Sequence, residues 1–122
     1  MNVQGDLVAR LSRALDGIAV SVTPSAPSPP EFVTVSRNGG GFENALIDVV
    51  GVDVYAWARS EGAAFSLMER VRRAMRSLPF SGGYASVLEE SVRRDPDPLT
   101  KTPRWYASYT LKVFDENAGK EP

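Results

Sequence analysis

Residues 46–78 read LIDVVGVDVYAWARSEGAAFSLMERVRRAMRSL and contain the two patterns that decide the fold. The first part, from Leu46 to Trp57, is rich in β-branched and aromatic residues, which favour a long strand. The second part starts at Ser60, a good helix N-cap, and Glu61 follows in the first turn, where the helix dipole favours a carboxylate. The apolar residues at helical spacing are Ala64, Leu67, Met68, Val71, Ala74, Met75 and Leu78.

A second strand-like run lies upstream, from Phe32 to Ser36. The residues 37–41, Arg-Asn-Gly-Gly-Gly, follow it and predict a turn or mobile loop. The two strands are therefore expected to form a hairpin with a long connection. Asp48 and Asp53 fall on opposite faces of the later strand, so one of them is expected near a strand end or a subunit contact.

The N-terminal stretch predicts a helix that ends at Gly17, followed by a short strand at 18–22. Four prolines between Thr23 and Pro30 exclude a helix interior or a central strand, so an extended connector is expected. This connector is either a plain surface linker, which we favour, or a proline-rich ligand for another domain. The apolar stripe of the helix consists of Val3, Leu7, Leu11 and Leu15.

Two further strands are expected after the central helix. Residues 84–94 predict one, with Tyr84, Leu88 and Val92 on one face, and residues 105–114 predict the other. The last strand alternates apolar and polar residues, as expected for an antiparallel sheet with one solvated face.

The element order of helix, two or three strands, helix and two strands predicts an α+β fold. We expect an antiparallel, possibly mixed, sheet of four to five strands with two main helices packed on one face. A chain of 122 residues fits one domain. This domain is placed at residues 1–114, and the polar residues 115–122 are expected to form a flexible C-terminal tail.

The absence of two residue types excludes whole classes of chemistry. The chain contains 0 Cys and 0 His, which rules out thiol nucleophiles, disulfides, Cys- or His-ligated zinc and Ser-His-Asp triads. The formal net charge of -1 argues against a dedicated nucleic-acid binder. No window approaches the ~18 apolar residues of a membrane span, and the N-terminus lacks a signal-peptide pattern. A soluble, unprocessed protein without a membrane partner is therefore expected.

Several sequence motifs are only weak indications of a phosphate-binding, catalytic or metal site. The glycine run at 39–41 lacks the Gly-Lys-Ser/Thr ending of a phosphate loop, and a strand rather than a helix follows it. Glu89 and Glu90 are adjacent on a strand, so they point to opposite faces and cannot act as a pair. Asp95 and Asp97 alone make a poor metal site. No catalytic, cofactor-binding or metal-binding residue is assigned, and an enzyme is the least favoured interpretation.

Arginines crowd the central helix and form a basic face of Arg72, Arg73 and Arg76. This face either contacts nucleic acid or an acidic partner, or is a solvated outer face that complements the helix C-terminus. Glu69 supports the solvated face, because it can pair with Arg72 or Arg73 within the helix.

Two loops and the open face of the sheet are the main candidates for partner contacts. The segment 93–104 is long for a hairpin connection and rich in charge and proline, so it is either an arm that reaches a neighbouring subunit or a disordered tip. The glycine-rich segment is the second candidate. The contact candidates are Asn38, Gly39, Gly40, Gly41, Phe42, Arg93, Arg94, Asp95, Asp97, Lys101 and Arg104.

The layout resembles tail terminator proteins of long-tailed phages and prophages, and the related tail-completion or head–tail joining proteins. The likeness covers residues 3–114. It concerns the order of the elements and several short sequence segments rather than a catalytic signature. The similar segments are the N-terminal helix, PEFVTVSR at 30–37 with its glycine turn, DVVGVDVYAWA at 48–58, SEGAA at 60–64 and TPRWYASY at 102–109.

The resemblance implies a virion-tail subunit that is assembled in the cytoplasm of the bacterial host. It implies a homo-oligomeric ring, expected to be a hexamer, on the last ring of the tail tube. There the ring would end tube polymerisation and join the tail to the head. The implied partners are the tail-tube protein, the head-completion or connector protein, and DNA that passes through the lumen without sequence-specific binding. The resemblance implies no cofactor. The alternative is a small nucleic-acid- or protein-binding adaptor that uses the basic helix face.

Overall fold

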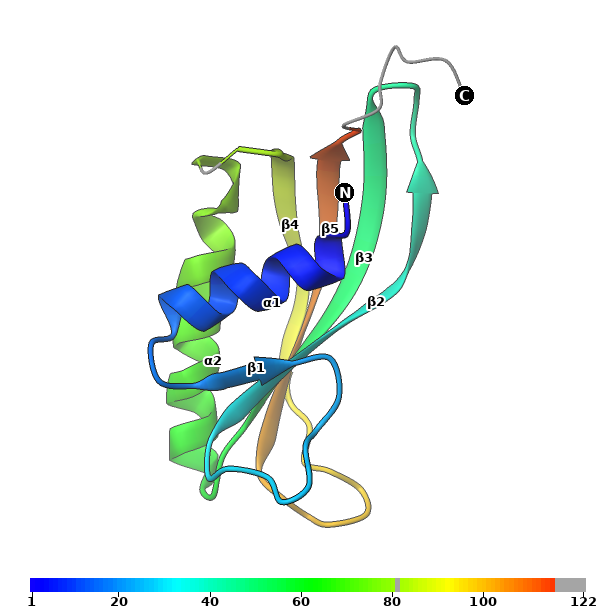
Figure 1. Ribbon diagram of the computed structural model, residues 1–122. Helices are drawn as coiled ribbons and strands as arrows, with labels where there is room; N and C mark the ends of the chain where they lie inside the picture. Colours follow the sequence, from blue (N-terminus) through cyan, green and yellow to red (C-terminus); the bar gives the residue numbers. More distant parts are fainter. Residues whose placement is uncertain (81, 116–122) are drawn as a thin grey trace.

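The computed structural model describes residues 1–80 and 82–115, which form a mixed five-stranded sheet and two α-helices (Figure 1). The strand order is β1-β2-β3-β5-β4, in which β1 pairs with β2 in parallel and the other neighbours are antiparallel. The predicted α+β class is confirmed. The elements are α1 (Val3–Ala14), β1 (Ala19–Ser21), β2 (Phe32–Phe42), β3 (Ile47–Trp57), α2 (Glu61–Arg76), the 3-10 helix η1 (Leu78–Phe80), β4 (Tyr84–Arg94) and β5 (Arg104–Phe114).

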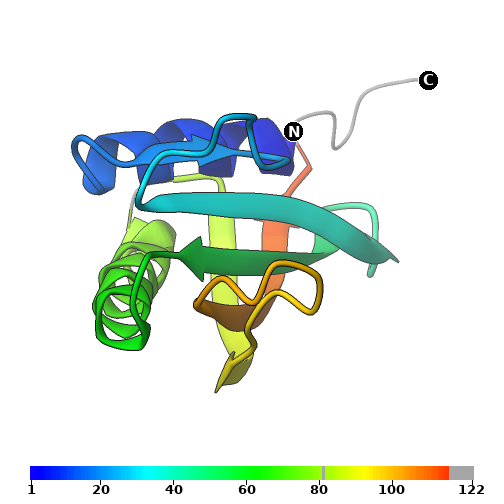
Figure 2. The same ribbon diagram turned by 90° about the horizontal axis from the view of Figure 1, so that it is seen from below.

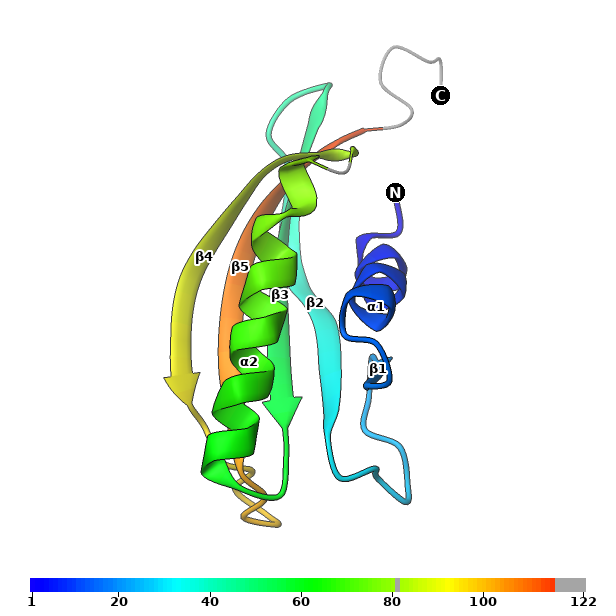
Figure 3. The same cartoon turned by 90° about the vertical axis from the view of Figure 1, so that its left-hand side faces the viewer.

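Both helices lie on one face of the sheet, as Figure 3 shows, and α1 crosses the direction of α2 (Figures 1 and 2). The apolar stripe predicted for the N-terminal helix is buried, with Leu7 fully inaccessible. It shares one core with Met68 of α2 and with the alternate residues of the strands, such as Val54 and Leu111. None of the described helices is long and apolar enough to cross a membrane.

Ser60 caps α2 as its position predicts. Its backbone is extended, and its side-chain oxygen accepts a hydrogen bond of 3.1 Å from the backbone N–H of Ala63. That bond satisfies one of the amides at the helix start that lack a partner within the helix. Arg73 and Arg76 lie in the last turn, where their charge complements the dipole.

Removing this cap should weaken the fold measurably. We expect Ser60→Ala to lower the free energy of unfolding by about 1 kcal/mol, because the Ala63 amide loses its acceptor. Urea denaturation followed by circular dichroism measures the change. Ser66→Ala, a change at an exposed position within the same helix, is the matched control and should leave the midpoint nearly unchanged. Equal losses in the two variants would contradict the capping role.

The expected glycine turn is wrong. β2 continues through the glycines to Phe42, and the chain reverses only at residues 43–46. A bulge between Arg37 and Gly39 absorbs one extra residue, so that Gly40 pairs with Val50 across the ladder. Gly40 has φ +111, a backbone conformation that favours glycine. It also lies against the carbonyl of Val49, which leaves no space for a Cβ atom. The glycines therefore permit a bent strand rather than a loop.

The expectation that Tyr84, Leu88 and Val92 share one face is confirmed for Tyr84 and Val92, which both face the core, and is wrong for Leu88. β4 contains two register shifts against β5, between Tyr84 and Ser86 and between Glu89 and Ser91. Each shift reverses the alternation, so Tyr84 is buried while Leu88 is 57% exposed. Glu89 consequently faces the helices.

The two aspartates of β3 lie on opposite faces, as predicted. Asp48 is near the strand end on the helix side, 3.9 Å from a guanidinium nitrogen of Arg37. Asp53 lies on the other, open face. The predicted C-terminal tail at 115–122 falls outside the described residues from residue 116 onward.

Candidate functional site

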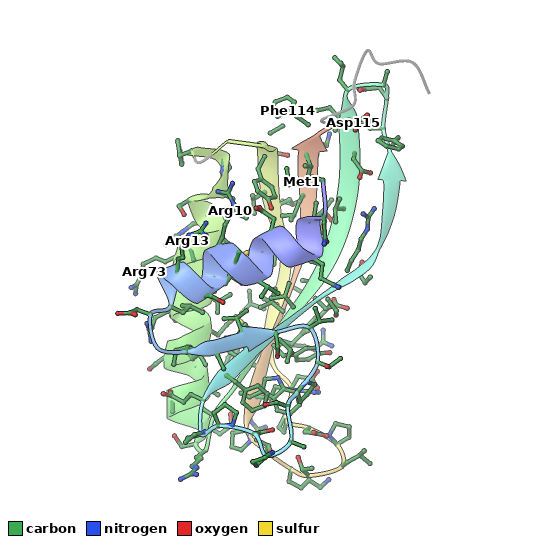
Figure 4. All side chains as sticks on the ribbon, in the orientation of Figure 1. Met1, Arg10, Arg13, Arg73, Phe114 and Asp115 are labelled. Atoms are coloured by element: carbon green, nitrogen blue, oxygen red, sulfur yellow. The ribbon has the colours of Figure 1, made fainter. Side chains whose placement is uncertain are left out.

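One end of the molecule displays exposed apolar side chains from three separate segments. Phe42 and Leu46 flank the β2–β3 turn, Phe80 lies on η1, and Phe114 ends β5; their exposed fractions are 69%, 59%, 90% and 53%. Figure 1 shows these segments at the same end of the sheet, and Figure 4 labels Phe114 there. We call these four residues the apolar end.

Backbone hydrogen bonds hold the segments of the apolar end together. The amide of Phe114 donates to the carbonyl of Gly83 over 3.0 Å, and the amide of Asp115 donates to the carbonyl of Leu46 over 2.8 Å. The side-chain oxygen of Asn44 accepts from the amides of Leu46 and Ile47, which fixes the turn. The backbone of these segments is thus fixed. Phe42 and Phe114 project from opposite faces of the sheet, because their ladder partners Asp48 and Ile47 are adjacent in β3.

Charges near the apolar end are largely paired with one another. Lys112 donates to Glu43 over 2.7 Å, and Arg37 lies near Asp48. The main feature that this end offers to a partner is therefore apolar. Exposed apolar surface of this kind commonly marks a protein–protein contact.

The opposite end of the sheet contains a groove with a volume of about 520 Å³. Phe32 and Trp57 line its base and stack with ring centroids 5.0 Å apart. The proline-rich connector forms one wall, and the β4–β5 loop forms the other. The wall residues are Pro24, Ser28, Pro29, Pro30, Asp97, Thr100, Lys101, Thr102 and Pro103, with Ala58 and Arg59 beside the base. We call this feature the proline groove.

Arg104, a predicted contact residue, instead stabilises the base of the proline groove. Its guanidinium carbon lies 4.1 Å from the centre of the Tyr55 ring and 4.8 Å from that of Trp57, and its side chain is only 12% exposed. It also donates to the backbone oxygen of Asp95 over 2.8 Å. Most of Arg104 is therefore engaged within the subunit.

The β4–β5 loop has a defined internal structure. The amide of Asp97 donates to the carbonyl of Thr102, and that of Lys101 donates to the carbonyl of Asp97. The amide of Leu99 donates to the Asp97 carboxylate, which lowers the pKa of that carboxyl. Lys101 is exposed, and its φ of 62 is left-handed. This loop is an ordered projection that carries a positive charge at the groove.

The open face of the sheet is covered by its own side chains. Tyr106 donates to Asp53 over 2.6 Å, and Asn38 donates to the same oxygen over 3.0 Å. Arg93 lies over the Tyr106 ring at 4.5 Å, and Tyr55 packs against that ring. Two further predicted contact residues, Asn38 and Arg93, thus help to satisfy and cover this face.

The basic helix face divides into paired and exposed arginines. Arg72 donates to Glu69 over 2.8 Å and to Glu89 over 2.7 Å, and its hydrogen bonds to Glu89 and then to Glu69 raise its pKa. Arg73 and Arg76 are exposed.

Arg73 lies near a second basic region on α1. Arg10 and Arg13 of α1 line a shallow groove of about 320 Å³ together with Ala74 of α2, and Figure 4 labels Arg73 beside them. Arg10 is paired with Asp6 over 2.8 Å.

The Arg72–Glu89 pair should make stability depend on pH. The hydrogen bond that Glu89 accepts from Arg72 lowers the pKa of Glu89 below the usual 4.5. A carboxyl with a lowered pKa in the folded state stabilises the fold above its unfolded pKa, and this stabilisation is lost as the pH falls through the folded pKa. Glu89→Gln should therefore cost about 1 kcal/mol at pH 7. The difference from the unmodified chain should shrink below pH 4.5.

Thermal unfolding between pH 3 and pH 7 measures this dependence. Glu90→Gln is the matched control, since the Glu90 carboxylate accepts a hydrogen bond from Thr110 and forms no ion pair among the described residues. A difference for Glu89→Gln that stays constant across this range would contradict the ion pair.

No protein-family model and no curated protein matches the chain. Among residues 1–80 and 82–115, no group of three acidic residues is placed so that it could hold a metal ion. Of the contact candidates predicted from the sequence, Phe42 belongs to the apolar end, and Asp97 and Lys101 line the proline groove.

Proposed function

We propose that this chain is an assembly subunit of a phage or prophage tail, which forms a ring that caps the tail tube and joins it to the head. The apolar end is the observation that carries this proposal. Four exposed large side chains, with Phe42 and Phe114 on opposite faces of the sheet, leave apolar surface at this end that is suited to burial in an assembly. The observed element order is also the layout on which the resemblance to tail terminators rests.

The magnitude of burial supports an assembly role. Fully burying one Leu or Phe side chain contributes about 1.5–3 kcal/mol. Partial burial of Phe42, Leu46, Phe80 and Phe114 across a subunit contact would offset a large part of the cost of association. The shape adds to this argument, because strands of 11 residues extend for roughly 36 Å. The apolar end is therefore well separated from the proline groove.

A tube-length assay tests the proposed function. Purified tail-tube protein from the same source is polymerised with and without this chain, and tube lengths are measured by electron microscopy. We expect shorter tubes with a cap of extra density at one end. Unchanged lengths and bare ends at saturating amounts of the chain would contradict the proposal. The chain unfolded by heat is the control.

The adaptor alternative is favoured only by the exposed arginines. Arg73 and Arg76 form no ion pair among the described residues. If they bind DNA, affinity should fall steeply with salt and should be lost in Arg73→Glu with Arg76→Glu. Fluorescence anisotropy at 50 mM salt measures this, and an absence of binding would remove the alternative.

A further inference from the structure

The two ends of the subunit are complementary in shape. The β2–β3 turn spans only residues 43–46 and projects beyond the rest of the sheet, as Figures 1 and 3 show. The exposed side chains of Phe42 and Leu46 flank this narrow tip. At the far end, two loops enclose the proline groove above the stacked rings of Phe32 and Trp57. One copy therefore carries both an apolar projection and an apolar depression.

We infer that the β2–β3 tip of one copy inserts into the proline groove of the next copy, in a head-to-tail contact. This inference rests on the proposed function, because it presupposes that the chain assembles with itself. The groove volume of about 520 Å³ lies within the range of pockets that bind compact apolar groups. Two apolar side chains at a narrow turn are occupants of that size and character.

The charges at the two ends also match. Arg59 and Lys101 lie at the proline groove, are exposed, and form no ion pair among the described residues, while Asp97 is the acidic residue of its lining. The tip carries Glu43, which is 44% exposed and pairs with Lys112. A tip that enters the groove would bring Glu43 toward Arg59 and Lys101. Such complementarity fixes the register of a contact and disfavours wrong partners.

Pairing between sheet edges is a less suitable route to assembly. β4 forms one edge of the sheet, and its two bulges distort the row of backbone groups that a new strand would need. The edge also carries the charged residues Glu90, Arg93 and Arg94, which oppose edge-to-edge pairing. A contact between the two ends avoids this edge.

A contact between two different surfaces has a consequence for symmetry. It leaves one tip and one groove unused in every dimer, so association continues until the chain of subunits closes. The rotation between neighbours then decides between a ring and an open filament. A head-to-tail contact is thus compatible with a ring, and a two-fold dimer is not its product.

Disulfide cross-linking tests the contact directly, because the chain has 0 Cys. Ala45→Cys places a thiol in the exposed tip, and Ser28→Cys places a nearly isosteric thiol in the groove wall. The two single variants are mixed and oxidised mildly, and mass spectrometry quantifies the mixed disulfide. Ser12→Cys, at an exposed position of α1, replaces Ser28→Cys in the control mixture.

We expect the tip–groove mixture to give about tenfold more mixed disulfide than the control, because a specific contact raises the local thiol concentration. The added change Leu46→Ser should reduce this yield toward that of the control. Yields equal to the control, in a sample that light scattering shows to be oligomeric, would overturn the inference and leave the proposed function standing. A chain that stays monomeric at its highest soluble concentration and does not cross-link would count against both.

Discussion

Gly40→Ala is expected to lower the free energy of unfolding by about 3 kcal/mol, a large loss for the addition of one methyl group. Two costs add at this position. The φ of +111 is unfavourable for a residue with a Cβ, and that Cβ would overlap the backbone carbonyl oxygen of Val49. The neighbour is main chain in the central strand β3, so it cannot turn aside as a side chain would.

Gly41→Ala provides the matched control for this prediction. A Cβ at Gly41 meets nothing within 4 Å, and its φ lies outside the left-handed region. Chemical denaturation of both variants should show a large loss for Gly40→Ala and a change within about 0.5 kcal/mol for Gly41→Ala. Similar stabilities for the two variants would show that the glycine segment is the mobile loop that its composition predicts.

Replacing Phe42 and Phe114 by Ser should weaken self-association about 100-fold, since each loses more than 1 kcal/mol of buried contact. Both side chains are more than half exposed in the subunit. Their replacement should therefore change the stability of the isolated fold by less than about 0.5 kcal/mol each. Sedimentation velocity over a concentration series measures the shift in the association midpoint.

Leu88→Ser is the matched control for the apolar end. Leu88 is 57% exposed on β4, outside the apolar end, so its loss removes a similar area from a different surface. The self-association of the Leu88→Ser variant should equal that of the unmodified chain. Equal weakening by Leu88→Ser would indicate non-specific hydrophobic association rather than a defined contact.

Local sequence patterns predicted most of the elements because short-range rules govern them. The helix after Ser60 follows from its cap and its apolar spacing, and both are present in the structure. The strands at Ile47–Trp57 and Arg104–Phe114 lie within one residue of the bounds predicted from β-branched and aromatic residues with an alternating pattern. These signals require no knowledge of distant contacts.

The errors fall at β-bulges, where a local pattern depends on a neighbouring strand. Three adjacent glycines suggest a loop, but pairing with β3 keeps Gly39 to Gly41 in an extended ladder. In β4, the bulge between Tyr84 and Ser86 reverses the face of Leu88, and the bulge between Glu89 and Ser91 returns Val92 to the face of Tyr84. Such shifts depend on the register of the partner strand, which a single sequence does not specify.

The candidate site was only partly predictable for the same reason. Phe42 directly follows the glycines in the sequence. Phe114 gave a weak signal, because it is an apolar residue in the alternating series that places the polar residues Thr110 and Lys112 on the solvated face. Phe80 and Leu46 join the apolar end only through the fold. The proline groove forms only where residues 24–30 and 97–103 lie side by side in the fold. No local sequence pattern predicts that these two segments are neighbours.

Native mass spectrometry of the unmodified protein over a range of concentrations is the sharpest test of whether this chain closes into a ring with itself, as we propose. We expect one discrete closed oligomer whose population grows with concentration at the expense of the monomer, with six copies expected from the resemblance to tail terminators. A monomer at every concentration, or an unbounded ladder of ever longer assemblies, would contradict it.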